Sequence, residues 1–296
     1  MKYENPAAFR QALDDRLKLE ATRTGLGLSR LRKRVAFELF LRRLAAVGGD
    51  RWILKGALAL DFRLPTATRS TKDIDIGRAD NEQAAIEDLT AAQQLALDDF
   101  FSYTVIRTDG LDESDDFSAV RFSVNAELAG RSFERFVLDV AFVDALPTNP
   151  ETIQTTGFLS FAGIEPIRIP AVPIHQHIAE KVHAYTRTYG AGGRPSTRPK
   201  DLVDLLLIEN SATIDADQLR EALERTFAVR GTHPLPDALP PAPPEWADPY
   251  GRLAREVGVE PELAAAHAHA ARFLDPVLDG TANGTWRTET ASWRVT

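Results

Sequence analysis

The stretch TRSTKDIDIGR, Thr68 to Arg78, reads as a short strand in which apolar and acidic residues alternate. Side chains along a strand point to its two faces in turn, so Ile74 and Ile76 share one face and Asp73 and Asp75 share the other. Two carboxylates on one face repel each other, and the arrangement needs a cation or hydrogen-bond donors nearby to offset that repulsion.

The composition is that of a soluble globular protein. The chain has 296 residues, 44% hydrophobic and 26% charged, which is enough for one large domain or two modest ones. It has no cysteine, which excludes disulfides, thiolate metal sites and a cysteine nucleophile. No apolar run is long enough to span a membrane and the N-terminus shows no signal peptide, so we expect a cytoplasmic protein without membrane association.

The net charge of −8 is unevenly distributed. Basic residues gather at Ser29–Arg34, at Arg42 and Arg43, and again over Arg187–Lys200. A local basic patch binds a polyanion even in an acidic protein, because affinity follows the phosphates contacted. The simpler interpretation, that these are solvated helix and loop surfaces, stays open at this point.

Hydrophobic periodicity predicts an α+β protein. Helices are expected at residues 5–24, 29–47, 56–64, 82–97, 173–187, 198–210, 216–229 and 261–273. Strands are expected at residues 51–55, 73–76, 101–107, 118–128, 135–143 and 284–296, with a turn at 109–116. The proline-rich stretch 232–250 is expected to be irregular. This order predicts a mixed-sheet lobe with N-terminal helices at residues 1–165 and a mostly helical lobe at 166–296.

A third acid belongs with the first two. Asp139 is the lone charge in the apolar run FVLDVAF, and a buried carboxylate without a partner is costly. Three acids that converge on one side of a sheet are satisfied by Mg²⁺, which prefers oxygen ligands. Alternatively, Asp75 caps a turn and Asp139 pairs with Arg121 or Arg135, and the acids alone favour neither interpretation.

The segment before the acidic strand indicates a phosphate site. ILKGALAL is a strand that runs into a helix through Lys55 and Gly56. Glycine lets a phosphate approach the backbone, and a helix N-terminus offers free N–H groups and a positive dipole. Strand, glycine, helix, loop and an Asp-x-Asp strand are laid out in this order in the nucleotidyltransferase superfamily.

Four motifs resemble the AbiEii/MenT family of nucleotidyltransferase toxins. They are LKGALAL, RSTKDIDI, IAEKVHAYTR and RPKDLVDLLLI, in the family's order, over roughly residues 50–210. The resemblance implies that Lys55 and Gly56 form the phosphate turn. The superfamily has serine after this glycine where the chain has Ala57, so either backbone N–H groups suffice or Ser70 and Thr71 supply the hydroxyl.

The resemblance also assigns catalytic and binding roles. It implies that Asp73, Asp75 and Asp139 hold Mg²⁺, with two ions expected. It implies that Lys181 contacts the incoming triphosphate. In the last motif, Arg198 and Lys200 are expected to bind the nucleotide, and Asp201 and the required Asp204 are expected to orient Lys181 or Arg198. From the residues alone, a structural salt bridge between Lys181 and either aspartate is the competing interpretation.

The resemblance implies that the protein transfers NMP from an NTP to the 3′ end of RNA. The expected donor is CTP or another pyrimidine nucleotide, and the expected acceptor is tRNA. Translation would then stop, and a cognate antitoxin is expected as partner; we expect a monomer. The segment Arg30–Arg34, with Arg42 and Arg43, is our prediction for the RNA-facing surface. Relatives silenced by phosphorylation beside the Asp-x-Asp strand make Ser70 and Thr71 candidate modification sites.

Two other functions remain open from the sequence. A glycosyltransferase also uses Asp-x-Asp with a divalent metal and a nucleotide-sugar, but it would normally place several α/β units before that motif. A non-catalytic nucleotidyltransferase-like fold that binds RNA or protein is the other alternative, which Ala57 leaves open and the intact carboxylates oppose.

Overall fold

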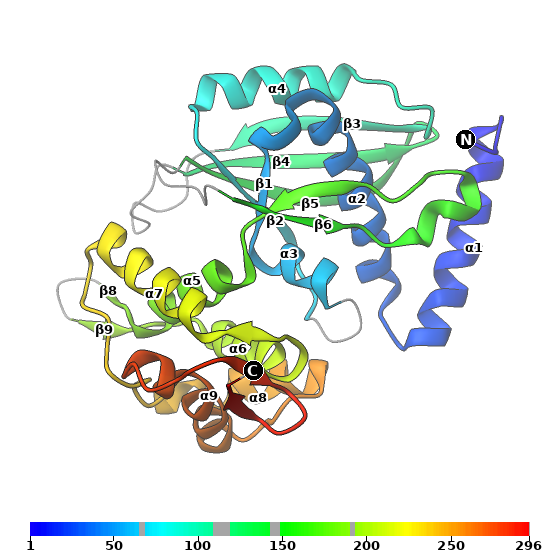
Figure 1. The fold of residues 1–296 in the computed structure, drawn as a ribbon. Coiled ribbons are helices and arrows are strands. Elements are labelled where there is room, and N and C mark those ends of the chain that lie inside the picture. The colour runs from blue at the N-terminus through cyan, green and yellow to red at the C-terminus, as the bar shows by residue number, and fades with distance from the viewer. Residues whose placement is uncertain (65–68, 109–118, 143–148, 190–192, 296) are drawn as a thin grey trace. The chain divides into compact units, whose positions relative to one another are not determined.

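A computed structural model describes residues 1–64, 69–108, 119–142, 149–189 and 193–295. The chain forms two compact units (Figure 1). The first comprises Met1–Arg63 and Ser70–Val172, and the second comprises Leu64–Arg69 and Pro173–Thr296. The sequence placed a single lobe boundary at residue 165, whereas the chain enters the second unit twice, first at Leu64 and again at Pro173.

The first unit is a mixed sheet with helices, as predicted. Its helices are α1 (Pro6–Thr24), α2 (Leu28–Gly48), α3 (Gly56–Arg63) and α4 (Glu82–Gln94), with 3₁₀ turns η1 (Gly49–Arg51) and η2 (Gly157–Ala162). Its strands are β1 (Ile53–Lys55), β2 (Asp73–Arg78), β3 (Phe101–Thr108), β4 (Ala119–Leu128), β5 (Arg131–Phe142), β6 (Glu151–Gln154) and β7 (Arg168–Ala171). The turn predicted at residues 109–116 lies outside the described residues.

The seven strands lie in the order β3-β4-β5-β2-β1-β7-β6. β2 runs parallel to β5 and β1 runs parallel to β7, while the other neighbours are antiparallel. The expected meander of residues 101–143 is the antiparallel part, β3 to β5. This order sets β2, the Asp-x-Asp strand, in the middle of the sheet, between β5 and β1.

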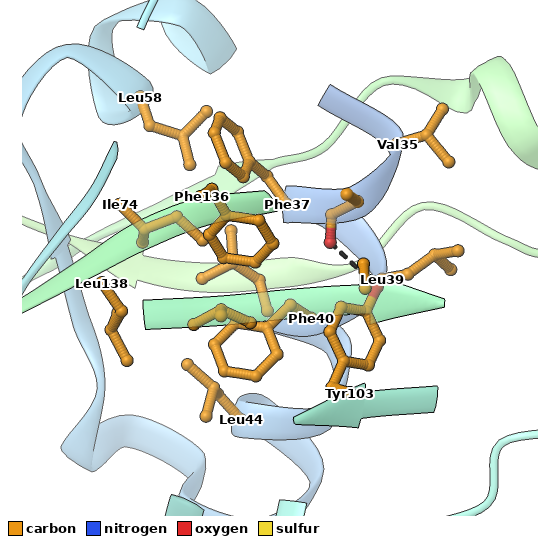
Figure 2. Close-up of a cluster of buried hydrophobic side chains, with 14 of the residues drawn as sticks. Val35, Phe37, Leu39, Phe40, Leu44, Leu58, Ile74, Tyr103, Phe136 and Leu138 are labelled. Carbon is orange, nitrogen blue, oxygen red and sulfur yellow. Dashed lines mark hydrogen bonds between the residues drawn. The ribbon is translucent and has the colours of Figure 1, made fainter. Parts of the chain in front are cut away.

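One face of this sheet carries the core (Figure 2). Ile74 and Leu138 are opposed in register on β2 and β5, and both are fully buried. Phe37 and Phe40 of α2 pack edge-on against Phe136 of β5, with ring centroids 4.9 and 5.6 Å apart. Because the apolar alternation turns these residues toward α2, the acidic positions of the same strands must project from the opposite face.

The second unit is mostly helical, as predicted, with two small sheets. Its helices are α5 (Ile174–Thr186), α6 (Pro199–Ser211), α7 (Ala216–Arg230), α8 (Ala247–Val257) and α9 (Leu263–Leu278), with the 3₁₀ turn η3 (Pro244–Trp246). β8 (Thr188–Tyr189) pairs with β9 (Arg194–Pro195), and β10 (Ile214–Asp215), β11 (Thr285–Arg287) and β12 (Ser292–Arg294) form a three-stranded sheet.

The prediction of irregular structure over residues 232–250 is wrong at its C-terminal end. There, η3 and α8 begin within the proline-rich stretch. Pro249 lies in the first turn of α8, where a helix has no partner for the N–H that proline lacks, so it does not break the helix. Buried Trp246 donates its indole N–H to the carbonyl oxygen of Ser196 at 2.8 Å and ties this stretch to the unit.

Strands β6 and β7 were not predicted. Each has four residues, too few for alternation to stand out, and Pro170 in β7 argues locally against a strand. No described helix combines the length and the apolar character that a membrane crossing requires.

Candidate active site

The glycine turn between β1 and α3 is built around Asp75. Gly56 has φ of +61°, a conformation that residues with a side chain rarely adopt. A β-carbon at this position would lie 1.9 Å from Oδ2 of Asp75. Only glycine therefore lets the Asp75 carboxylate lie this close to the first turn of α3. The sequence predicted glycine here for the access of a phosphate to the backbone, and it did not show this contact with Asp75.

Asp73 and Asp75 lie on the same face of β2 and are half-buried, while Ile74 and Ile76 are 0% and 1% exposed in the core. The alternation predicted for this stretch is confirmed. The buried Thr71 donates its hydroxyl to Oδ1 of Asp73 at 2.9 Å. This bond fixes one oxygen of Asp73 and leaves Thr71 inaccessible, whereas the adjacent Ser70 is exposed.

Four charged residues form a row across the sheet. Lys55 of β1 is opposite Asp75 of β2, which is opposite Asp139 of β5, which is opposite Arg121 of β4. Directly opposed residues on neighbouring strands project to the same face. We call these four residues the charged row; its charges run positive, negative, negative, positive, with Asp73 two positions along β2 on the same face.

Asp139 lies on the predicted face but it is paired. The two terminal oxygens of its carboxylate each accept a hydrogen bond of 2.8 Å from the guanidinium of Arg121. This is the ion pair that the sequence left open as an alternative to a metal ligand. Among the described residues no three His, Cys, Asp or Glu side chains are grouped so as to hold a metal ion.

The acids of β2 nevertheless suit a divalent cation. Mg²⁺ is commonly bound by one or two carboxylates together with phosphate oxygens of a substrate, and it does not require a cage made only of protein. Asp73 and Asp75 offer hard oxygen donors on one accessible face. The donor chemistry of this pair therefore fits the ion, while each oxygen of Asp139 already accepts a hydrogen bond from Arg121.

A separate cluster lies inside the second unit. Lys181 of α5 is 2.5 Å from Oδ2 of Asp204 and 3.3 Å from Oδ1 of Asp201, both on α6. All three side chains are buried. The i, i+3 spacing of the two aspartates puts them on one side of α6, as the sequence indicated.

The two aspartates stay ionised because cations surround them. Burial by itself would raise the pKa of Asp204, but the charges of Lys181 and Arg69 outweigh it and hold this pKa below its ordinary value. Burial likewise acts to raise the pKa of Asp201, and Lys181 and Arg198 together lower it. Lys181, Arg69 and Arg198 therefore keep both carboxylates charged inside the unit.

Arg69 is a member of this cluster that sequence reasoning missed. Its guanidinium makes a two-pronged ion pair with Asp204, at 2.9 and 3.1 Å. Arg198 of the last motif donates to Oδ2 of Asp201 at 2.7 Å, and Lys200 lies half-buried in the first turn of α6. Nothing local marks Arg69, since its partner is 135 residues away in the chain.

The predicted RNA-facing surface on the N-terminal helices is wrong for three of its arginines. Arg43 is 1% exposed and makes a two-pronged ion pair with Asp99. Arg30 and Arg34 both pair with the buried Asp61 of α3, at 3.2 and 3.0 Å, and their side chains are 12% and 15% exposed. These cations neutralise carboxylates inside the first unit and offer little surface to a polyanion.

Comparison with known proteins adds an independent finding. The family model described as nucleotidyl transferase AbiEii toxin, type IV toxin–antitoxin system, matches residues 39–288. No curated protein matches the chain in sequence.

One solved structure shows a similar fold, and two others match with lower scores. MenT4, a nucleotidyltransferase toxin from Mycobacterium tuberculosis, superposes with a TM-score of 0.59 at 20% identity, over 90% of this chain and 88% of that one. JHP933 from Helicobacter pylori gives a TM-score of 0.43 at 17% identity, over 84% of this chain and 94% of that one. A putative nucleotidyltransferase from the same organism gives 0.41 at 18% identity, over 84% and 97%.

Proposed function

The chain belongs to the AbiEii family of nucleotidyltransferase toxins, and we propose that it transfers a nucleoside monophosphate from an NTP to the 3′ end of an RNA, releasing pyrophosphate. One observation carries the proposal. Asp73 and Asp75 share the half-buried acidic face of β2, and Asp75 lies against a turn that only glycine can form. A paired carboxylate beside a helix N-terminus is the local chemistry that this reaction needs.

The reaction itself is a phosphoryl substitution. The RNA 3′-hydroxyl gives its proton to water, and its oxygen bonds to the α-phosphorus of the NTP. The bond from that phosphorus to the bridging oxygen breaks, and pyrophosphate leaves with the electron pair. A divalent cation held by Asp73 and Asp75 would neutralise charge that develops on the phosphate oxygens. Thr71 keeps Asp73 oriented, and the backbone N–H groups at the start of α3, with Lys55, are proposed to bind the triphosphate.

From the family resemblance, Lys181 is proposed to contact the incoming triphosphate. Its ion pairs with Asp201 and Asp204 support this role, because they hold the ammonium group in one place. Asp201 and Asp204 are positioning residues in this proposal, because carboxylates repel a triphosphate and each already holds a cation. Arg198 and Lys200, at the start of α6, are proposed as further phosphate contacts.

The proposed biological role is supported by the family and by the sequence resemblance. We propose tRNA as the acceptor, CTP or another pyrimidine nucleotide as donor, and arrest of translation as the outcome, with restraint by a cognate antitoxin. Ser70 is exposed and therefore accessible to phosphorylation, while Thr71 is buried and bonded to Asp73. Of the two candidate modification sites, the proposal therefore keeps Ser70.

The test is direct labelling. Purified protein is incubated with Mg²⁺, total tRNA and each α-³²P-NTP in turn, and the RNA is resolved on a denaturing gel. Asp75→Asn removes one charge without changing the size of the side chain and should abolish the label. Asp15→Asn, which alters an exposed carboxylate on α1, is the matched control and should label as the wild type does.

Each outcome decides a part of the proposal. Label on tRNA with one nucleotide, lost in Asp75→Asn, supports reaction, acceptor and donor together. If tRNA stays unlabelled and total cellular RNA supplied in its place is labelled, the reaction stands and tRNA is removed as the acceptor. If folded protein gives no label with any NTP but turns over a nucleotide-sugar, the proposal is overturned in favour of a glycosyltransferase. If the protein binds a nucleotide and never consumes it, the non-catalytic fold is favoured.

A further inference from the structure

Arg121 of β4 is the cation that pairs with Asp139 in the charged row. It is opposite Asp139 in the register of β4 and β5, so the backbone pairing itself sets the two side chains together on the open face of the sheet. Its guanidinium meets the carboxylate with two hydrogen bonds of 2.8 Å each, the fork geometry that makes arginine–carboxylate pairs strong and specific.

The environment of the pair strengthens it. The side chain of Asp139 is 13% exposed, whereas that of Arg121 is 39% exposed, so the carboxylate lies beneath the guanidinium. Removing the cation would leave a largely buried charge beside a second carboxylate, because Asp75 is the neighbour of Asp139 on the other side. Arg121 occupies one lone pair on each oxygen of Asp139, so a metal ion that binds this carboxylate must either share it with the guanidinium, whose positive charge repels the ion, or displace Arg121 and bear this cost.

The influence of Arg121 extends beyond its partner. Its hydrogen bonds to Asp139 raise the pKa of Arg121 first, and the charges of Asp139, Asp73 and Asp75 raise it further. The guanidinium is thus close enough to all three acids to act on them electrostatically. With Asp139 held in this ion pair, the other two acids on which Arg121 acts are Asp73 and Asp75 of β2.

We propose that Arg121 takes the place of a second metal ion, so that this site binds one divalent cation, at Asp73 and Asp75, where two ions were expected from the sequence. The inference rests on the function proposed above and concerns how many ions the carboxylates hold. Arg121 is a positioning residue in this scheme: it holds Asp139 and balances charge from one end of the charged row, as Lys55 does from the other.

The experiment counts ions with Mn²⁺ in place of Mg²⁺. The intact chain is loaded with Mn²⁺ and α,β-methylene-CTP, which cannot release pyrophosphate, and bound manganese is measured by equilibrium dialysis and by electron paramagnetic resonance. Two Mn²⁺ ions that share a carboxylate give a spin-coupled spectrum, and a single ion does not. Arg121→Gln keeps a polar side chain of similar length and frees Asp139.

The matched control is Arg135→Gln. Arg135 is an exposed arginine on the same face of β5, and its guanidinium donates to Oδ1 of Asn125. Its loss therefore changes the net charge equally without removing the partner of Asp139. Circular dichroism and thermal unfolding establish that each variant is folded before it is loaded.

We expect one Mn²⁺ and an uncoupled spectrum for wild type and Arg135→Gln, and a second ion with a coupled spectrum for Arg121→Gln. A coupled pair in the wild type overturns the inference and leaves the proposed function standing. A single ion in Arg121→Gln also overturns it, because Arg121 would then not be what excludes the second. No bound Mn²⁺ in the wild type, with a spectrum equal to that of Asp75→Asn, overturns the proposed function itself.

Discussion

Replacing Gly56 by alanine tests the geometry on which the site depends. The backbone at this residue has φ of +61°, so a side chain there costs about 1–2 kcal/mol in backbone strain alone. The new β-carbon would also lie 1.9 Å from Oδ2 of Asp75, and the carboxylate must move by about 1.5 Å to reach the 3.4 Å of an ordinary contact. A displacement of about 1 Å in a reacting group costs on the order of 100-fold in rate.

Gly25 supplies the matched control. It ends α1 with φ of +73°, and a β-carbon added there would meet nothing within 4 Å. Gly25→Ala therefore carries the same kind of strain without a clash. Urea unfolding should show Gly56→Ala to be the more destabilised of the two, and the labelling assay should show its transfer rate reduced about 100-fold while Gly25→Ala transfers normally.

A second background isolates the clash. In Asp75→Ala the carboxyl group that the new methyl would strike is gone, so the excess cost of Gly56→Ala over Gly25→Ala in unfolding free energy should shrink. Equal costs for the two glycines in the wild-type background, together with an unchanged transfer rate for Gly56→Ala, would refute the reasoning. The turn would then be a backbone feature unrelated to Asp75.

Three further predictions concern single polar groups. Thr71→Val removes the hydroxyl that orients Asp73 and should slow transfer about tenfold, the equivalent of one hydrogen bond, with little change in melting temperature; an unchanged rate contradicts this role. Asp204→Asn takes one of two carboxylates from buried Lys181 and should cost about 3–5 kcal/mol in urea unfolding, and a loss below about 1 kcal/mol contradicts it. Burial raises the pKa of Glu38 from 4.5 to about 7, so folded protein binds this proton more tightly than unfolded protein and loses stability as the pH rises from about 4.5 through 7. Glu38→Gln should therefore have the same unfolding free energy as the wild type at pH 4 and exceed it at pH 8 by at most about 3 kcal/mol. If the variant and the wild type are equally stable at both pH values, burial does not hinder the ionisation of Glu38.

Local patterns were sufficient where the determinants are local. The alternation of Asp73 to Ile76 predicts a strand with one buried and one acidic face. The structure has this strand, because residues two apart on a strand share a face. The starts of α1, which Asn5 caps, and of α3 at Gly56 are likewise set by neighbouring residues. The first residues of this strand and of both helices were predicted to within one position.

Pairing between distant segments was beyond the sequence. Asp139 was open to a metal or to an arginine, and only the register between β4 and β5 decided in favour of Arg121. Arg69 belongs to the cluster of the second unit because it pairs with Asp204. Arg43 was expected on a basic surface and is buried in an ion pair with Asp99. The physical reason is common to all of them: charge and periodicity tell which groups need a partner, but the partner is chosen by which strands and helices pack together, and that choice is made by the fold as a whole.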